Sequence, residues 1–404
     1  MTTQPMRIVI VGASLAGLNA ARALREYGHV GPITLIGEEP YSPYDRPPLS
    51  KGFLTSDANH SSLALTDTAA LGLTELYGRR AVHLDPSERT VHLDVGQSVP
   101  YDGLVIATGV GALRWPSPLP ATGVHTLRTL DDATALRRDL GTRPRRILVV
   151  GGGFIGTEAA ATAAELGHDV TLTFQGPAPL HRVIGEDAAS FLSELHRTAG
   201  VSLVPFATLT ALQGRQRVTS VTLNGARQVN ADTVVLALGT TPHTDWLSTS
   251  GLRLDRGLVT DSHARVVGTN GRPHLSIVAA GDVTRFPHPH ASGLVNLGHW
   301  SNAVEQARTA AHTLLYPHAP AIYRPVASFW STQFGVRFRA VGLPREADEA
   351  EAREVDIERR RLNVAYYRDG RLVGALTANR AAAIAQYREQ LATALESSAR
   401  ARAA

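Results

Sequence analysis

Cysteine is absent from the 404 residues of this chain. Its absence excludes thiol nucleophiles, dithiol redox pairs, cysteine-ligated zinc and iron–sulfur clusters held by the chain itself. No apolar run is long enough to cross a membrane, and the first apolar run is strand-length and leads into a glycine turn, unlike a signal peptide. No basic block with interleaved aromatic residues occurs. We therefore expect a cytoplasmic protein that binds neither membrane nor nucleic acid.

Lysine is nearly absent as well. Lys51 is the only lysine among the 40 basic residues, and the formal net charge is +4. A mildly basic surface suits an acidic protein partner, and scattered solvated arginines explain the same charge equally well. A chain of this length exceeds one ordinary hydrophobic core, so two or three domains are expected.

Residues 7–39 have the order strand, small-residue turn, helix, strand. The small residues of the turn are Gly12, Ser14, Ala16 and Gly17. Glu38 follows the second strand, with Glu39 as the alternative, at the place where an acid accepts hydrogen bonds from a ribose. This is the dinucleotide-binding arrangement, in which the start of the helix offers free N–H groups to a pyrophosphate.

The same pattern restarts at residues 146–174. The glycines of its turn are Gly151, Gly153 and Gly156, a complete G-x-G-x-x-G. The apolar strands at 104–109 and 233–239 both end in glycine, one after each pattern. Two matched units predict two bound nucleotides.

The rest of the chain completes the predicted architecture. Three prolines make 41–51 a fixed loop, and a further strand ends in Gly281-Asp282. From about 326 the pattern changes to antiparallel strands and a C-terminal helix. We expect an α/β fold with two Rossmann-like dinucleotide-binding domains plus a C-terminal α+β domain with an antiparallel sheet. The predicted bounds are 1–115 and 248–325 for a discontinuous first nucleotide-binding domain, 116–247 for the second nucleotide-binding domain, and 326–404 for the C-terminal domain.

Eight segments occur in this order: VIVGASLAGLNAARALR, PYDRPPLSK, VIATG, LVVGGGFIGTEAA, AAGDVTRFP, HWSNAVEQA, FWSTQFG and DGRLVGAL. Together they resemble the FAD-dependent, NAD(P)H-dependent ferredoxin reductases, which include putidaredoxin and rhodocoxin reductases and the reductase components of ring dioxygenases. The resemblance covers essentially the whole chain. The proline loop and the FWS segment are more specific than either glycine turn. The apoptosis-inducing-factor flavoproteins share the architecture more distantly.

The resemblance implies the cofactors, FAD and either NADH or NADPH as electron donor, and the residues that hold them. The implied FAD contacts are Gly12, Ser14, Ala16, Gly17, Glu38, Arg46, Lys51, Val82, Arg128, Asp282 and Trp300. The implied nicotinamide nucleotide contacts are Gly151, Gly153, Ile155, Gly156 and Gly239. The implied catalytic residues are Lys51 and Glu158, paired near the reactive face of the flavin, and Trp330 beside it.

Structural alternatives exist for several of these residues. Trp300 and Trp330 also suit plain core positions, Glu158 a solvated helix face, and Lys51 an ordinary surface. A lysine in a rigid loop and an acid at the buried start of an Ala-rich helix favour the pairing, because either charge buried alone would cost several kcal/mol. His288 and His290 flank a proline with no nearby acid, which favours a loop over a metal site.

Two departures from the family pattern concern the nucleotide turns. Ser14 replaces a glycine, and serine is small enough to preserve the turn. Phe174, followed by Gln175, stands where an NADH-dependent enzyme usually has glutamate. That acid binds the ribose 2′-hydroxyl and repels a 2′-phosphate, so its loss relaxes the discrimination between NADH and NADPH.

The resemblance implies a flavoprotein oxidoreductase that passes electrons from NAD(P)H through FAD to an iron–sulfur ferredoxin of 2Fe–2S or similar type. The ferredoxin would serve a cytochrome P450 or a Rieske-type oxygenase, and the reductase would be a monomer or homodimer. A partner-independent NAD(P)H oxidase or diaphorase is one alternative. A nucleotide-responsive flavoprotein like the apoptosis-inducing factors is the other. A disulfide reductase is excluded because cysteine is absent.

Overall fold

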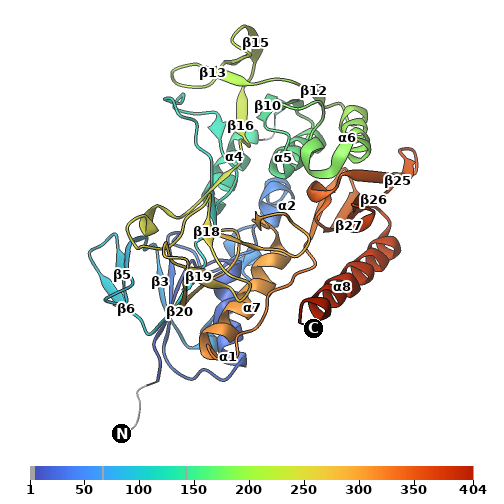
Figure 1. Cartoon of the computed structure of the whole chain (residues 1–404). Coiled ribbons are helices and arrows are strands. Elements are labelled where there is room, and N and C mark those ends of the chain that lie inside the picture. Colours follow the sequence, from blue (N-terminus) through green and yellow to red (C-terminus); the bar gives the residue numbers. More distant parts are fainter. Residues whose placement is uncertain (1–4, 66–67, 142, 404) are drawn as a thin grey trace. The chain divides into compact units, whose positions relative to one another are not determined.

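The structure is a computed structural model that describes residues 5–65, 68–141 and 143–403 (Figure 1). It contains two compact units. Unit 1 comprises the described residues up to Asp45, His60–Gly111 and Thr241–Ala327, and unit 2 comprises Arg46–Asn59, Ala112–Thr240 and the described residues from Ser328. The three-domain division expected from the sequence stays a prediction.

Unit 1 is built on a six-stranded sheet with the order β19-β20-β7-β1-β2-β3. Its strands are β1 (Ile8–Val11), β2 (Ile33–Gly37), β3 (Leu73–Tyr77), β7 (Gly103–Ile106), β19 (Arg265–Val267) and β20 (Pro273–Ala279). All pairs are parallel except β19 with β20. Every residue of β1 is buried, as expected of a central strand covered on both faces.

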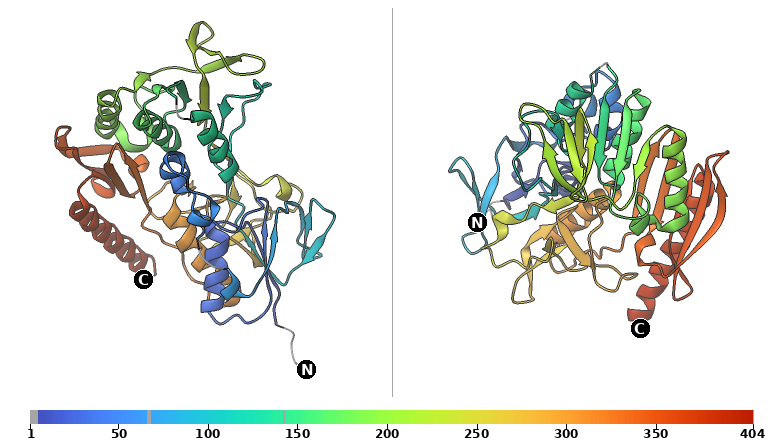
Figure 2. Two further views of the ribbon diagram at one scale, coloured as in Figure 1. Left: turned by 180° about the vertical axis from the view of Figure 1, so that it is seen from behind. Right: turned by 90° about the horizontal axis from the view of Figure 1, so that it is seen from above.

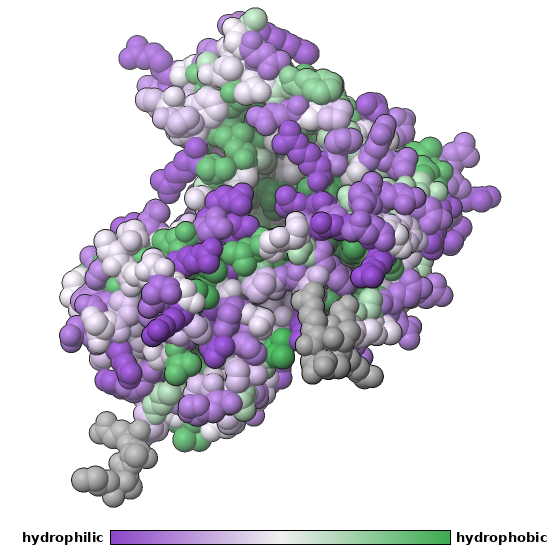
Figure 3. Space-filling view, viewed as in Figure 1, coloured by the Kyte–Doolittle hydropathy of each residue, from purple (hydrophilic) through white to green (hydrophobic). Residues whose placement is uncertain are grey.

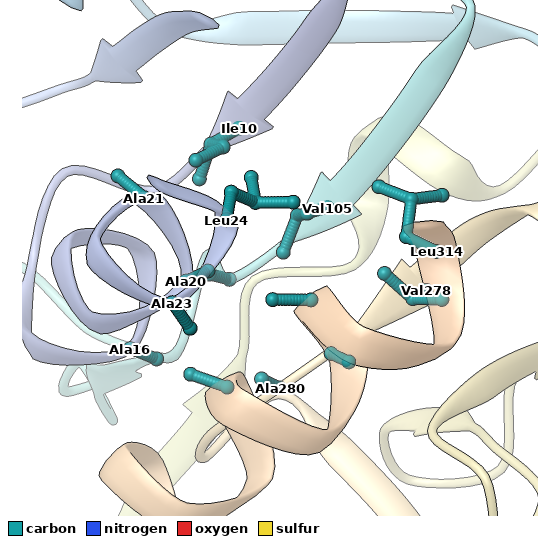
Figure 4. Close-up of a cluster of buried hydrophobic side chains, with 14 of the residues drawn as sticks. Ile10, Ala16, Ala20, Ala21, Ala23, Leu24, Val105, Val278, Ala280 and Leu314 are labelled. Carbon is teal, nitrogen blue, oxygen red and sulfur yellow. The ribbon is translucent and has the colours of Figure 1, made fainter. Parts of the chain in front are cut away.

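Helices α1 (Leu15–Glu26) and α7 (Trp300–Leu315) lie side by side on one face of this sheet (Figure 1). Small side chains such as Ala16, Ala20 and Ala23 form much of their contact, together with alanines of α7 (Figure 4). Methyl groups allow the two helix backbones to approach closely, so α7 is held against the helix that follows the first glycine turn.

The other elements of unit 1 are short. A three-stranded sheet contains β4 (Ala81–Asp85), β5 (Thr90–Leu93) and β6 (Ser98–Pro100), and another contains β18 (Leu258–Val259), β21 (Thr284–Pro287) and β22 (Leu294–Val295). The short helices are α3 (His60–Leu63), η2 (Ala69–Leu71) and η3 (Asp245–Leu247). The strands β8 (Val110–Ala112) and β17 (Thr240–Pro242) occur where the chain passes from one unit to the other.

Unit 2 repeats the plan with a five-stranded sheet of order β12-β11-β10-β16-β9. Its parallel strands are β9 (Val124–His125), β10 (Arg146–Val150), β11 (Asp169–Thr173), β12 (Ser202–Val204) and β16 (Thr233–Leu236). Its remaining elements before the C-terminal part are η1 (Pro47–Ser50), α2 (Gly52–Thr55), α4 (Leu130–Leu140), α5 (Phe154–Glu165), α6 (His181–Thr198), β13 (Leu209–Gln213), β14 (Ser220–Leu223) and β15 (Arg227–Asn230).

The C-terminal part of unit 2 is an antiparallel sheet of order β23-β24-β27-β26-β25. Its elements are β23 (Ser328–Gln333), β24 (Val336–Gly342), η4 (Pro344–Glu346), β25 (Glu349–Asp356), β26 (Arg361–Arg368), β27 (Arg371–Ala378) and α8 (Ala381–Ala403). Apolar residues of α6 share one core with this sheet, and Figure 2 shows the helix beside its strands. The predicted fold class, with two nucleotide-binding sheets and a C-terminal antiparallel sheet, is confirmed.

The surface drawn in Figure 3 is mostly hydrophilic, with apolar residues in separated patches. Within the described residues, no helix combines the length and the hydropathy needed to cross a membrane.

Candidate functional site

The first glycine turn closes tightly between β1 and α1. The amide of Gly12 donates to the carbonyl of Ile36 at 2.8 Å, and Gly12 has φ +121°. A Cβ on Gly12 would lie 2.1 Å from the carbonyl oxygen of Ala107, and one on Gly17 would lie 1.9 Å from that of Gly12. Neither position accepts a side chain, so the turn brings bare backbone to the start of α1.

Gly281-Asp282 reaches the same end of α1. A Cβ on Gly281 would lie 3.0 Å from the Cβ of Ala16, which is the second residue of α1. The amide of Gly281 donates to Oε1 of Gln306 in α7 at 2.9 Å, so α7 fixes this turn. The structure therefore places Asp282 near the first glycine turn, although about 270 residues separate them in sequence.

The two acids after β2 have different environments. The hydroxyl of buried Tyr44 donates to Oε2 of Glu39 at 2.6 Å. Glu38 is exposed and directly follows Gly37, where an added Cβ would lie 2.6 Å from the Cβ of Ala13 in the turn. Because Glu39 already holds Tyr44, the geometry favours Glu38 as the ribose-binding acid.

Trp300 begins α7, and its indole Nε1 donates to Oδ1 of Asp45 at 2.9 Å. The contact ties the tryptophan to the start of the proline loop and leaves it 38% exposed, which a plain core residue would not be. Burial lowers the pKa of the neighbouring His299 to about 4, against the opposing effect of Asp282. Val82 lies in β4 with a 42% exposed side chain.

The second glycine turn repeats the first. The amide of Gly151 donates to the carbonyl of Thr173 at 2.8 Å, and a Cβ on Gly151 would lie 2.1 Å from the carbonyl oxygen of Ala237. A Cβ on Gly156 would lie 1.8 Å from the carbonyl oxygen of Gly151. Gly153 is the N-cap of α5 and has no side chain to cap it, so the first amides of α5 face the turn.

The end of β11 contains the residues that replace the family acid. Phe174 is buried, and its Cβ would lie 2.8 Å from a Cβ on Gly152 in the glycine turn. Gln175 is exposed. Ile36 and Thr173 accept the equivalent amides of the two turns, so Phe174 corresponds to Gly37 and Gln175 to Glu38. Neither position carries a negative charge, so nothing there repels a 2′-phosphate.

Lys51 and Glu158 form the predicted ion pair inside unit 2. Nζ of Lys51 lies 2.5 Å from Oε2 of Glu158, and the two side chains are 25% and 6% exposed. Nζ also donates to the carbonyl of Pro47 at 3.0 Å, so the proline loop fixes the lysine. The hydroxyl of Ser50 donates to the same Oε2 at 2.5 Å. The structural alternatives of a solvated glutamate and an ordinary surface lysine are therefore wrong.

The other predicted residues of unit 2 occupy separate positions. Nη1 of Arg46 donates to the carbonyl of Arg128 at 2.8 Å, so these two are brought together. Gly239 has φ +109° and accepts the amide of Leu113 at 3.0 Å. Two of the predicted site residues have exposed apolar side chains, Ile155 at 41% and Trp330 at 45%, so Trp330 is not a plain core residue.

Sequence reasoning missed the polar residues that surround Glu158. Ser331 and Gln333 of β23 and His196 of α6 are buried and linked to it by hydrogen bonds. Within the segment FWSTQFG, only the tryptophan was predicted as a site residue. The alternation of Ser331 and Gln333 on one strand face was the available signal, because such residues at buried positions require partners.

These features fit a dinucleotide with a pyrophosphate, such as FAD, in unit 1. The turn admits no side chain at Gly12 or Gly17. Ser14 is the N-cap of α1 but its hydroxyl makes no capping bond, which leaves the first amides of the helix to a ligand. The second turn offers the same cradle to a nicotinamide nucleotide, with Gly151 and Gly156 also too close to backbone for side chains.

Comparison with known proteins agrees with this chemistry. Residues 6–307 match the model of the pyridine nucleotide-disulphide oxidoreductases, and residues 328–404 match the reductase C-terminal family. Rhodocoxin reductase of Rhodococcus erythropolis is 36% identical over 352 residues, which cover 85% of this chain and 79% of the relative. Rubredoxin-NAD(+) reductase of Pseudomonas putida is 32% identical, covering 93% and 96%. A solved covalent putidaredoxin reductase–putidaredoxin complex has a TM-score of 0.89 and 31% identity, covering 96% of this chain and 93% of that one.

The chain belongs to the pyridine nucleotide-disulphide oxidoreductase family, and within it to the FAD-dependent NAD(P)H:ferredoxin reductases. The family resemblance predicted from the sequence is thus confirmed. The protein is an oxidoreductase that uses FAD and NAD(P)H. Because the chain has no cysteine, it lacks the thiols that the disulphide chemistry in the family's name requires.

Proposed function

We propose that this flavoprotein passes electrons from NAD(P)H, through FAD, to a small 2Fe–2S ferredoxin that serves a cytochrome P450 or a Rieske-type oxygenase. The observation that carries the proposal is the joint match of both the nucleotide-binding part and the C-terminal domain to reductases of this type. A relative from Sphingomonas named ferredoxin–NAD(P)(+) reductase and the putidaredoxin complex support a small electron-transfer protein as acceptor. We also propose a cytoplasmic location, a monomer or homodimer, and the three-domain division at 115, 247 and 325.

The residues of unit 1 are assigned to FAD. The bare backbone at Gly12 and Gly17 accepts the pyrophosphate, with Ser14 and Ala16 small enough to leave it room. Glu38 accepts hydrogen bonds from the adenosine ribose. Asp282, Trp300 and Val82 are assigned to the ribityl chain and the ring system, and Arg46 and Arg128 of unit 2 to the same cofactor.

The second turn is assigned to the nicotinamide nucleotide. Its glycines and the amides at the start of α5 bind the phosphates, Ile155 presents an exposed side chain, and Gly239 presents backbone. The uncharged pair Phe174 and Gln175 supports acceptance of both NADH and NADPH. The contacts proposed for this turn are Gly151, Gly153, Ile155, Gly156 and Gly239.

When bound, FAD supplies the redox chemistry, because it accepts a hydride and releases electrons one at a time. Side chains of this chain then only position and shield the reacting groups. Lys51 and Glu158 are proposed to hold a fixed pair of opposite charges at the flavin, and Trp330 to cover it. The low exposure of Glu158, 6%, keeps water away from its carboxylate.

Anaerobic stopped-flow reduction tests the first half of the proposal. The purified protein is expected to contain FAD, and NADH or NADPH is expected to bleach it. A protein purified without flavin would contradict the FAD assignment. A flavin that neither nucleotide bleaches would contradict the role of the second turn.

Cytochrome c reduction tests the second half. Turnover is expected to be slow with the reductase alone and to rise steeply when a 2Fe–2S ferredoxin is added. Fast oxygen or quinone reduction that ferredoxin does not increase would instead identify an oxidase or diaphorase. Slow reduction with a long-lived charge-transfer band would identify a nucleotide-responsive flavoprotein.

A further inference from the structure

A chain of buried side chains leads away from Glu158 on the side opposite Lys51. Oγ of Ser331 lies 2.6 Å from Oε1 of Glu158, while Lys51 holds Oε2. Nε2 of Gln333 lies 3.0 Å from Oγ of Ser331, and Nε2 of His196 lies 2.9 Å from Oε1 of Gln333. The exposures of Glu158, Ser331, Gln333 and His196 are 5%, 1%, 3% and 0%. Water therefore cannot replace any of these contacts.

The carboxylate at one end dictates the direction of every hydrogen bond in the chain. An ionised Glu158 only accepts, so the single hydroxyl proton of Ser331 must point to it. Ser331 must then accept from Gln333, which places the amide NH2 of Gln333 toward Ser331 and its Oε1 toward His196. His196 is therefore the donor, with its proton on Nε2.

The surroundings of His196 agree with this tautomer. Its Nδ1 is buried and has no hydrogen-bond partner within the described residues, so a second proton there would be unsatisfied. Burial lowers the pKa of His196 to about 4, against the opposing hydrogen bond to Gln333. The second N–H of Gln333 donates to Oγ1 of Thr157 at 3.1 Å, and Thr157 in turn donates to the carbonyl of Phe154. In this orientation of its side-chain amide, Gln333 thus has a hydrogen-bond partner for each of its side-chain polar atoms.

We propose that Ser331, Gln333 and His196 are positioning residues that fix the orientation of the Glu158 carboxylate. They come from β23 and α6, whereas Glu158 is on α5, so a strand of the C-terminal sheet and the helix α6 hold a side chain of the helix that follows the second glycine turn. With Oε1 held by Ser331, Oε2 stays directed at Lys51. The inference rests on the proposed function of the Lys51–Glu158 pair at the flavin.

Nitrogen-15 NMR of the histidine-labelled holoprotein tests the direction of the chain without any measurement of activity. The ring signals of His196 are assigned by their loss in His196→Gln. We expect one neutral tautomer, protonated on Nε2, from about pH 6 to pH 8. A proton on Nδ1, or an imidazolium in this range, would overturn the proposed direction.

Variants of Ser331 test the positioning role. Ser331→Ala leaves Oε1 of buried Glu158 without its donor, so we expect the limiting rate of flavin reduction to fall about tenfold. The KM for the nucleotide is expected to stay within about twofold, because binding at the glycine turn is unaffected. Ser331→Thr retains the hydroxyl and is expected to recover most of the rate.

Ser193→Ala is the matched control. Ser193 is also buried and donates to the carbonyl of Ala189 one turn earlier in α6, so its loss removes a buried hydroxyl outside the chain. A Ser331→Ala rate equal to that of wild type, or equal losses in both alanine variants, would overturn the positioning role. If Ser331→Ala does not fold, Gln333→Glu replaces it, because a carboxylate there accepts the Ser331 proton and removes it from Glu158.

Failure of the proposed function has a different signature. In that case neither nucleotide reduces the flavin of the wild-type protein, while the NMR signals of His196 still report the tautomer. Failure of the inference leaves wild-type reduction intact, with either the wrong tautomer or no effect specific to Ser331.

Discussion

Two pairs of glycines in the nucleotide turns leave no space for a Cβ, and this gives a residue-level test of which turn binds which cofactor. In Gly17→Ala the new methyl would meet the carbonyl oxygen of Gly12 at 1.9 Å, so the first turn must open. We expect the variant to be purified with less than about a tenth of the normal FAD, because the pyrophosphate site is lost. Flavin absorbance per protein measures this content.

Gly156→Ala makes the equivalent change in the second turn. It is expected to retain FAD and to lose reduction by the nucleotide. Gly293→Ala is the control, since an added Cβ there meets nothing within 4 Å. Normal flavin content in Gly17→Ala would contradict the assignment of the first turn to FAD.

Phe174 provides a second residue-level prediction, on nucleotide preference. Its side chain lies against Gly152 in the second turn, one residue before Gln175, so Phe174→Glu would bring a carboxylate beside the position that corresponds to Glu38. We expect kcat/KM for NADPH relative to NADH to fall about tenfold or more, because a carboxylate repels the 2′-phosphate. Steady-state kinetics with both nucleotides measure the ratio.

Two further variants distinguish the effect of the added charge from the loss of the phenylalanine ring and from the choice of position. Phe174→Leu removes the ring without adding charge and is expected to leave the ratio within about twofold. Gln175→Glu adds the charge at the position that corresponds to Glu38. An unchanged ratio in both glutamate variants would show that the 2′-phosphate does not approach the end of β11.

The ion pair of Lys51 and Glu158 was predictable from the sequence, whereas the residues behind it were not. The resemblance and the cost of burying a lone charge both point to the pair. Ser331 meets Glu158 across 173 positions and His196 meets Gln333 across 137. No local periodicity connects residues so far apart, so only the folded chain shows that they are neighbours.

At the scale of elements, each of the two nucleotide-binding sheets has its own arginine–aspartate contact. The contact lies at the start of the strand that leads into the glycine turn. In unit 1, Arg7 before β1 donates to Asp102 from its backbone amide, Nε and Nη2. In unit 2, Arg146 at the start of β10 donates to Asp232 from the same three atoms. Each contact joins the strand that leads into the glycine turn to the strand beside it, at the opposite end from the turn.

These contacts predict a pH dependence of stability. The hydrogen bonds from Arg7 and Arg146 lower the pKa of Asp102 and of Asp232 to about 2, below the ordinary value of about 4. A folded-state pKa below the unfolded value stabilises the fold above about pH 4, and this contribution is lost as the pH falls toward 2. Half-exposed pairs contribute little, so Asp102→Asn is expected to lower Tm by about 1–2 °C at pH 7.

The same comparison at pH 3 tests whether the charge of the Asp102 carboxylate causes the stabilisation. There the difference between Asp102→Asn and wild type is expected to shrink to about half of its value at pH 7. Asp57→Asn, at an exposed position, is the control and is expected to change Tm at neither pH. A difference that stays constant from pH 7 to pH 3 would show that the carboxylate charge is not what stabilises this contact.

Elements with strong local patterns were predicted well. Buried apolar runs predicted the central strands, and the helix expected within residues 7–39 is α1. The kink of α6 at Gly185, with φ +73°, was not expected. The helix bends where the hydroxyl of Tyr366 in β26 donates to the carbonyl of Ile184, and such a tertiary contact leaves no periodic signal.

At the scale of the whole molecule, the net charge of +4 predicts how the protein meets its acceptor. Exposed Arg337 and Arg339 lie in β24, and Arg339 is paired across the strands with Trp330. With an acidic 2Fe–2S ferredoxin, we expect the rate of its reduction to fall as salt concentration rises, because opposite charges steer the encounter. Reduction of a neutral quinone is expected to show little salt dependence.

Charge-reversal variants test which part of the surface attracts the ferredoxin. Arg339→Glu is expected to raise the KM for ferredoxin about fivefold or more and to weaken its salt dependence. Arg371→Glu is the matched control, because Arg371 lies at the other end of β27, six residues from Thr377, the partner of Arg339. Equal effects of the two variants would show that overall charge, and not this strand, guides the ferredoxin.

Lys51 has one more consequence as the only lysine of the chain. Reagents that modify primary amines have two targets here, the α-amino group and a side chain that lies in the proposed reactive centre. Coupling to amine-reactive supports or dyes is therefore a poor way to handle this protein. Reductive methylation with carbon-13, by contrast, would give a single side-chain resonance, so the chain already contains a unique spectroscopic label beside Glu158.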